Sequence, residues 1–317
     1  MKIGIDLGGT NIAGGLVDKD FNIIISKSVK TGKERPALEI IADIAGLISD
    51  IVETAGISFD QVDSIGIGSP GIVDRTLGKV IYSNNIRWDD VSLRDGVNQY
   101  IKKSIFVDND ANCAALGEFV AGAAKGYNSA VVITFGTGIG GGIIIDKKLH
   151  HGFNSAANHI GHMVVVSKGD ECTCGRRGCW ESYASVTALI RMAEIAAKAY
   201  PQSELAALMK EPGYLDGKNI FQAAKDGDRA AIDVVDQYFY YIAEGITDIT
   251  NILQPEVIVL GGGLSNEGDY LLKPVIAQVK KDVFCKEVPI PDIKISDLRN
   301  NAGIIGAALL EEYQTTV

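Results

Sequence analysis

The sequence predicts an α/β protein made of two similar domains with a substrate cleft between them. Three observations lead to this fold class. The 317 residues correspond to about two domains of ordinary size. Strand-like and helix-like patterns alternate along the chain. The pattern of residues 5–18 returns at residues 133–146, which indicates that one strand–turn–strand unit has been duplicated.

The first half predicts a strand meander followed by helices and buried strands. The first strand starts at Lys2 and enters the glycine turn Gly8-Gly9-Thr10. Residues 36–55 carry apolar side chains at helical spacing, which predicts an amphipathic helix. Further strands are apolar runs that end at turn-forming residues. They are expected at 12–18, 21–28, 62–68 and 105–107, before an alanine-rich helix at about 111–123.

The second half begins with the repeat. Residues 5–18 and 133–146 align at an offset of 128, with four of fourteen positions identical. Their apolar, glycine and final aspartate positions also coincide, so two strands joined by a glycine turn are expected at 130–145. The remaining patterns predict helices at 184–200, 228–253 and 302–313, and strands at 257–260 and 293–296.

Composition excludes several classes of protein. Thirty Lys and Arg against forty Asp and Glu give a net charge of −10, which disfavours nucleic acid as a partner. No stretch has the roughly 20 apolar residues of a membrane span, and no signal peptide pattern is present. Five cysteines, an odd number, argue against a disulfide framework. We therefore expect a cytoplasmic protein with reduced thiols and no membrane partner.

Glycine is enriched, with 36 residues, and three glycine loops directly follow predicted strands. They contain Gly8-Gly9, residues 136–142 and residues 261–263. Glycine lets a ligand approach backbone N–H groups, and Thr10 and Thr137 add hydroxyl donors. One such loop is also typical of a plain hairpin turn, but three favour phosphate binding. None matches the P-loop or a dinucleotide-binding motif.

A polar run, Asp108-Asn109-Asp110, lies where a predicted strand passes into a helix. Helix capping alone explains one of the three side chains. The others are left at the carboxyl end of a strand, where α/β proteins gather their sites. A carboxylate there can accept a hydroxyl proton, and an amide can hold sugar hydroxyls.

A metal site is predicted by His162, Cys172, Cys174 and Cys179, which read H-x9-C-x-C-x4-C. One histidine and three cysteines supply the four ligands of a closed, structural zinc site. A redox pair or plain structural thiols are the alternatives. Glu181, two residues beyond the last cysteine, is either a solvated carboxylate at a helix start or one directed into the cleft.

Together these motifs resemble the ROK family, which contains bacterial sugar kinases and related repressors of the actin-like ATPase superfamily. The similarity runs in order through nearly the whole chain, and the cysteine segment is its most specific part. The matching segments are DLGGT at 6–10, GSPG at 68–71, DNDANCAALGE at 108–118, FGTGIGGG at 135–142, GH at 161–162, CTCGRRGCWE at 172–181, GGG at 261–263 and AGIIGAA at 302–308.

The resemblance implies two actin-like, ribonuclease-H-like α/β domains around a central substrate cleft. Residues 1–117 with 300–317 would form the smaller domain, and residues 118–299 the larger one with a zinc-binding loop. A homodimer or homotetramer is expected. The implied activity is ATP-dependent phosphorylation of a hexose, glucose first, at its 6-hydroxyl, with Mg²⁺-ATP as the donor. Polyphosphate is an alternative donor.

The resemblance also assigns roles to residues. Asp110 is the expected general base. The expected sugar contacts are Gly71, Asn85, Asn109, Asp110, His159, His162 and Glu181. The expected ATP and phosphate contacts are Asp6 (through Mg²⁺), Gly8, Gly9, Thr10, Thr137, Gly138, Gly262 and Gly263. The Zn²⁺ ligands are His162, Cys172, Cys174 and Cys179.

One position departs from the family. Relatives usually carry E-x-G-H, whose Glu binds sugar hydroxyls, whereas this chain has His159 there. A carboxylate accepts two hydroxyl donors, but a neutral imidazole offers one acceptor and one donor. A lost hydrogen bond of this kind costs about 1–3 kcal/mol. Either the preferred sugar has changed, or glucose binds more weakly, or Glu181 takes over the contact.

Several alternative functions follow from this departure. A kinase for N-acetylmannosamine, N-acetylglucosamine, fructose or allose is one, and a catalytically impaired sugar-binding protein is another. A sugar-responsive repressor is a third, which is disfavoured because the first strand begins at Lys2 and leaves no room for a preceding DNA-binding domain. The intact Asp110 and the three glycine loops favour the kinase.

Overall fold

The computed structural model describes residues 1–211 and 214–314. The chain forms two compact units. The first unit contains residues 1–133, residues 141–158 and the chain from Ser296 onward; the second contains residues 134–140 and 159–295. The expected domains, residues 1–117 with 300–317 and residues 118–299, likewise place the C-terminal end of the chain in the first domain. These domain boundaries stay a prediction.

The first unit is built on a five-stranded sheet in the order β3-β2-β1-β4-β8. β1 pairs antiparallel with β2, and β2 with β3, whereas β1, β4 and β8 are parallel. The strands are β1 (Lys2–Leu7), β2 (Asn11–Val17), β3 (Ile23–Lys30), β4 (Ser64–Ser69) and β8 (Ile105–Asn109). The predicted meander is confirmed. The carboxyl ends of the three parallel strands meet at one edge, as expected for parallel pairing.

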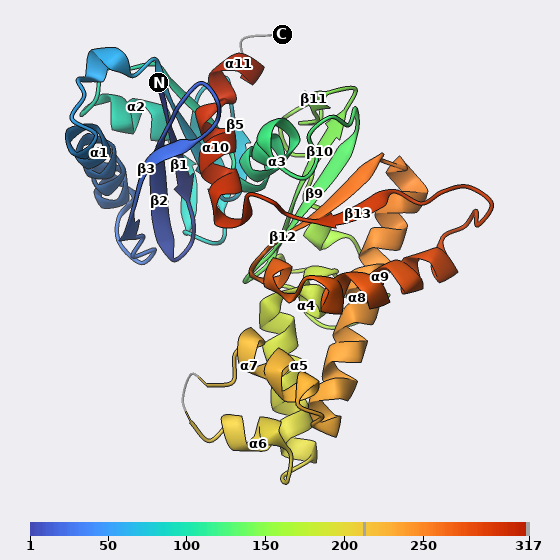
Figure 1. Cartoon of the computed structure of the whole chain (residues 1–317). Helices are drawn as coiled ribbons and strands as arrows, with labels where there is room; N and C mark the ends of the chain where they lie inside the picture. The colour runs from blue at the N-terminus through green and yellow to red at the C-terminus, as the bar shows by residue number, and fades with distance from the viewer. Residues whose placement is uncertain (212–213, 315–317) are drawn as a thin grey trace. The chain divides into compact units, whose positions relative to one another are not determined.

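Helices cover both faces of this sheet (Figure 1). Successive residues of β2 face opposite sides, and a Cβ on Gly14 would meet Leu47 and Ile51 of α1 (Ala37–Thr54), whereas one on Gly15 would meet Ile304 of α10 (Ala302–Ala308). The α1 face that packs on the sheet is fully apolar. Each aliphatic side chain buried there contributes about 1.5–3 kcal/mol.

Several glycines outside the loops serve packing rather than ligand binding. A Cβ on Gly66 of β4 would collide with the carbonyl of Ala307, and one on Gly4 with that of Ile304. Gly117 makes the same kind of approach between α10 and α3 (Asp110–Ala121). Part of the glycine enrichment therefore lets α10 lie directly against the sheet and α3.

A small antiparallel sheet lies between β4 and β8 in the sequence and is absent from the prediction. Its strands are β5 (Ile72–Asp74), β6 (Lys79–Ser83) and β7 (Trp88–Val91), followed by α2 (Leu93–Asn98). Arg94 fastens it to the large sheet, because its guanidinium donates to the carbonyls of Ile105, Thr76 and Arg75 at 2.8–2.9 Å. These short strands were missed because their polar residues mask the alternating pattern.

The second large sheet has the order β11-β10-β9-β12-β13, which repeats the order of the first. Its strands are β9 (Ala130–Phe135), β10 (Ile139–Ile145), β11 (Lys148–Leu149), β12 (Val257–Gly262) and β13 (Asp292–Ile295). Both bounds of β9 and of β10 lie 128 residues after those of β1 and β2. The predicted duplication is confirmed.

The helices at 184–200 and 228–253 are confirmed, and the second unit adds further helices. They are α4 (Glu181–Ala184), α5 (Val186–Ala199), α6 (Glu204–Leu208), α7 (Gly217–Lys225), α8 (Arg229–Leu253) and α9 (Asp269–Asp282). The prediction of a single helix at 302–313 is wrong, because the helix is interrupted after α10 and a second helix, α11 (Leu310–Gln314), follows. Short 3-10 turns are η1 (Phe59–Gln61), η2 (Ile160–His162), η3 (Gly263–Glu267) and η4 (Arg299–Asn301). Within the described ranges no helix is long and apolar enough to cross a bilayer.

Candidate functional site

The carboxyl edge of the first sheet gathers several predicted site residues. In the parallel register Asp6 of β1 lies beside Gly68 of β4, and Gly68 lies beside Asp108 of β8. Asn109 and Asp110 follow Asp108 directly at the start of α3. Asp6 and Asp108 are about 100 positions apart in the sequence and lie at the same edge of the sheet, as expected for an α/β site.

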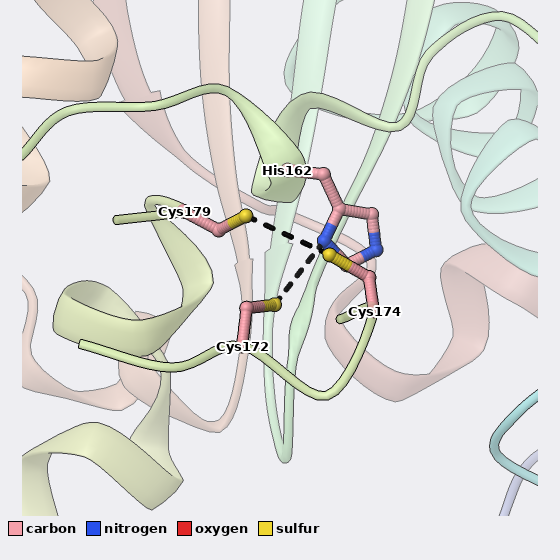
Figure 2. A group of neighbouring side chains, drawn as sticks. All are labelled: His162, Cys172, Cys174 and Cys179. Atoms are coloured by element: carbon pink, nitrogen blue, oxygen red, sulfur yellow. Dashed lines mark hydrogen bonds between the residues drawn. The ribbon is translucent and has the colours of Figure 1, made fainter. Parts of the chain in front are cut away.

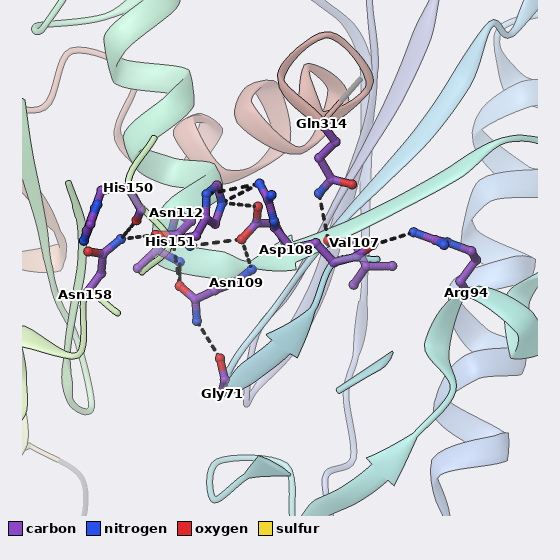
Figure 3. A network of polar contacts seen from close by, with 12 residues as sticks. Gly71, Arg94, Val107, Asp108, Asn109, Asn112, His150, His151, Asn158 and Gln314 are labelled. Carbon is purple, nitrogen blue, oxygen red and sulfur yellow. Dashed lines mark hydrogen bonds and ion pairs between the residues drawn. The ribbon is translucent and has the colours of Figure 1, made fainter. Parts of the chain in front are cut away.

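Asn109 caps α3, which confirms the capping interpretation for one residue of the polar run. Its Oδ1 accepts from the backbone N–H groups of Ala111 at 2.9 Å and Asn112 at 3.1 Å. Its Nδ2 donates to the carbonyl of Gly71 at 3.0 Å, so two predicted sugar contacts lie together (Figure 3). Because Asn109 serves as the N-cap, the carboxylate of Asp110 is not required for that role.

Two carboxyl groups at this edge, those of Asp6 and Asp110, have raised pKa values. Burial, followed by the charge of Asp110, raises the pKa of Asp6 to about 7. Burial also raises the pKa of Asp110, against the opposing effect of a 2.9 Å hydrogen bond from the Ala111 N–H. Raised pKa values in neighbouring carboxyl groups are typical of a general base and of a site that binds a cation.

The first glycine turn is held in place by its neighbours. The Gly8 N–H donates to Asn11 O at 3.0 Å, and the Gly8 carbonyl accepts from Thr31 Oγ1 at 2.7 Å. A Cβ on Gly9 would lie 3.9 Å from the carbonyl of Asn85, so this predicted sugar contact lies beside the turn. Thr10 is exposed. The hydrogen bonds of Gly8 thus hold the turn, while Thr10 stays accessible to a ligand.

The glycine loops of the second unit also lie together. Gly262, at the end of β12, has a φ of +80°, and a Cβ there would collide with the carbonyl of Phe135 at the end of β9. Only glycine tolerates both conditions. The Thr137 carbonyl accepts from Thr187 Oγ1 at 2.8 Å, which anchors its loop to the start of α5. Thr137 and Gly263 are exposed.

Glu181 lies between a glycine loop and the cysteine cluster. Its Oε2 accepts from the backbone N–H of Ile139 at 3.0 Å, and a Cβ on Gly138 would collide with the same oxygen. Its Oε1 is 3.9 Å from Cys172 Sγ. Glu181 is the first residue of α4 and is half-buried, and its carboxylate packs against the predicted phosphate loop. Its contact with the sugar stays a prediction.

The structure brings His162, Cys172, Cys174 and Cys179 together, as Figure 2 shows. One ligand atom from each lies within 4.8 Å of all the others. Cys172 Sγ is 3.6 Å from His162 Nδ1, and the Sγ atoms of Cys174 and Cys179 are 3.7 Å apart. Ligands of tetrahedral zinc are separated by about 3.5 Å for S and N and about 3.8 Å for two S atoms. These two separations match a tetrahedral zinc site, and the four ligand atoms lie close enough together for one ion to join them.

Without a metal, the protonated thiol is favoured at Cys179. Burial and the two neighbouring thiols raise the pKa of Cys179 to about 12. A divalent ion reverses this effect, because it stabilises thiolates. The loop itself is held by backbone contacts: the Cys172 N–H donates to Arg176 O at 2.8 Å, and Gly178 has a φ of +83° against the Val166 carbonyl.

His159, the residue that departs from the family pattern, lies beside this cluster. Its ring centroid is 6.5 Å from that of His162. Although more than a third of its surface is exposed, partial burial of the ring and then the His162 imidazole lower its pKa. A neutral imidazole therefore stands where the resemblance led us to expect a carboxylate.

Two polar side chains of the first unit, His151 and Asn158, were not among the predicted site residues. His151 Nε2 lies 2.8 Å from Asp108 Oδ2, and Asn158 Nδ2 donates to Asn112 Oδ1 at 2.9 Å (Figure 3). Neither belongs to a motif, because a single histidine or asparagine in a loop carries no local signal. Only the pairing of β11 and the turn after it brings this segment to α3.

Two sheets of one topology, both with glycine turns at strand ends and the first with carboxylates there, define an actin-like α/β protein. The profile of the ROK family matches residues 2–313. The chain belongs to the ROK family.

Individual relatives include kinases and a repressor. A glucokinase from Halalkalibacterium halodurans is 36% identical over 313 residues, which cover 98% of this chain and 95% of the relative. The crystal structure of a ROK family glucokinase from Streptomyces griseus, in complex with glucose and AMPPNP, matches with a TM-score of 0.87 at 36% identity and covers 98% of each chain. A xylose repressor from Bacillus spizizenii is 30% identical over 96% of this chain and 75% of the repressor.

Proposed function

We propose that this protein is an ATP-dependent hexose kinase that phosphorylates the 6-hydroxyl of its sugar, with glucose as the first candidate. The observation that carries the proposal is the half-buried Asp110, which lies at the carboxyl edge of the first sheet beside Asp6, on the turn that Asn109 caps. Similarity to glucokinases over nearly the full chain supports the same activity.

In the proposed reaction Asp110 accepts the proton of the sugar 6-hydroxyl while that oxygen forms a bond to the γ-phosphorus of ATP. The bond from this phosphorus to the bridging oxygen breaks, and ADP leaves with that electron pair. Backbone N–H groups of the glycine loops, with Thr10 and Thr137, hold the phosphates. Bound Mg²⁺ would offset the phosphate charge, and Asp6 is the residue that would face it. Positioning supplies most of the rate.

Zinc has a structural role in this proposal. His162, Cys172, Cys174 and Cys179 would hold the ion, with Nδ1 as the metal-facing nitrogen of His162. Nε2 of the same ring is then left to contact the sugar, so the metal orients a substrate contact. We also expect a homodimer or homotetramer, and ATP rather than polyphosphate as the donor.

The proposed activity is tested by incubating the purified protein with ATP, Mg²⁺ and a panel of sugars, and measuring ADP release. The panel contains glucose, fructose, allose, N-acetylglucosamine and N-acetylmannosamine. We expect turnover with glucose above that with the other four. Turnover with another sugar alone changes the substrate but keeps the kinase. No ADP with any sugar, together with sugar binding in calorimetry, would instead indicate a binding protein or repressor.

His159→Glu is expected to lower the KM for glucose about tenfold, with little change in kcat. A carboxylate at this position accepts two hydroxyl hydrogen bonds where the neutral imidazole accepts one, and a matched hydrogen bond is worth about 1–3 kcal/mol. Steady-state kinetics with glucose provide the measurement. His150→Glu adds the same charge at an exposed histidine and serves as the control. An unchanged KM in the His159 variant would show that this position does not determine affinity.

A further inference from the structure

Asp108 carries a buried carboxylate next to the turn that bears Asp110. Its side chain is 3% exposed. Oδ1 accepts from the Asn109 N–H at 2.7 Å and from Asn112 Nδ2 at 3.0 Å. These contacts use one oxygen and come from the N-cap residue and the first turn of α3. The other oxygen needs a partner from elsewhere, since an unpaired buried carboxylate is strongly unfavourable.

His151 supplies that partner. Its Nε2 lies 2.8 Å from Asp108 Oδ2, and its side chain is only 13% exposed. Nη1 of Arg75 lies 3.1 Å from both ring nitrogens, so a cation covers the imidazole on another side. The contacts Arg75–His151–Asp108 therefore link two other segments of the first unit to the strand end that precedes Asp110.

A second link joins the same two segments. Asn112, on the first turn of α3, donates to Asp108 and accepts from Asn158 Nδ2 at 2.9 Å. Asn158 has a φ of +72° and donates to the His150 carbonyl as well, at 2.5 Å. The segment from His150 to Asn158 is thus held at His151 to the end of β8 and at Asn158 to the first turn of α3 (Figure 3).

We propose that His151 is a positioning residue for phosphoryl transfer: its Nε2–H holds Asp108 and so fixes the backbone turn on which Asp110 stands. The inference rests on the proposed kinase function. His151 acts through Asp108 and does not itself contact the reacting atoms. A base displaced by about 1 Å can cost on the order of 100-fold in rate, so loss of this contact lowers kcat more than it changes substrate binding.

The decisive comparison is between His151→Gln and His151→Asn. The Gln amide nitrogen reaches the position of Nε2 and can donate to Asp108, whereas the Asn amide is too short. We expect His151→Gln to keep kcat within about threefold of the native value. His151→Asn should lose about 10–100-fold in kcat, with both KM values within about threefold. His150→Asn, one residue away with an exposed side chain, is the matched control and should behave as the native protein.

Amide hydrogen exchange gives a readout that does not depend on activity. In His151→Asn the N–H groups of Ala111 and Asn112, which donate to the cap, should exchange at least tenfold faster than in His150→Asn. Equal kcat in the Gln and Asn variants, or unchanged exchange at these amides, overturns the inference. Absence of turnover in the native protein with every sugar overturns the kinase instead, and the exchange result still decides the role of His151.

Discussion

Asp110→Asn is expected to lower kcat for sugar phosphorylation by about 10²–10⁴-fold, with KM values for sugar and ATP changed by less than about threefold. The amide keeps the shape of the side chain and can still accept the Ala111 N–H, but it cannot take the hydroxyl proton. The measurement is ADP release with saturating glucose and Mg²⁺-ATP.

The matched control for this variant is Asp269→Asn. Asp269 is also the first residue of a helix, α9, but it is exposed and pairs with Lys273 at 3.0 Å. Its substitution should leave kcat unchanged. Turnover of Asp110→Asn at the native rate would remove Asp110 from the mechanism, while the loops and the cysteine cluster would keep their assignments.

The same residue predicts a pH dependence. A general base works only when deprotonated, and burial raises the pKa of Asp110. The rate should therefore fall as the pH is lowered through a pKa above the ordinary range of aspartate, which is near 4. A plot of kcat/KM against pH provides the test, with this acidic limb missing from the residual activity of Asp110→Asn.

The second large effect is expected from loss of the metal. Cys179→Ser should purify with far less than one zinc per chain, and its kcat/KM should fall by more than tenfold, because the loop no longer holds His162 and Glu181 in place. Elemental analysis and kinetics measure the two effects. Limited proteolysis should cut the variant within residues 163–180, which are protected in the native protein.

Cys285→Ser is the control for the metal site. Cys285 lies outside the cluster, so its substitution should keep one zinc and full activity. A native protein without zinc, together with full activity in Cys179→Ser, would contradict the assignment. Chelation followed by addition of Zn²⁺ should restore the native protein and leave Cys179→Ser inactive.

Much of the fold was predictable because its signals are local. The offset of 128 residues between the two glycine hairpins predicted a duplicated unit, and the two sheets have the same strand order. The cysteine spacing predicted a four-ligand cluster, and the ligand atoms do converge. The sheet at Ile72–Val91 was missed and the last helix was drawn too long, because short polar strands and a break at Leu309 have weak patterns.

By itself, the sequence determined the class of the protein and the kind of chemistry, since motifs record which residue types stand at fixed spacing. Tertiary structure alone decided which groups restrain the site. Asp108 and His151 are 43 residues apart and become a buried pair only when the strands assemble. Glu181 reaches Ile139 across 42 residues in the same way. Such contacts arise from strand register and packing of distant segments, and neither leaves a trace in local composition or periodicity.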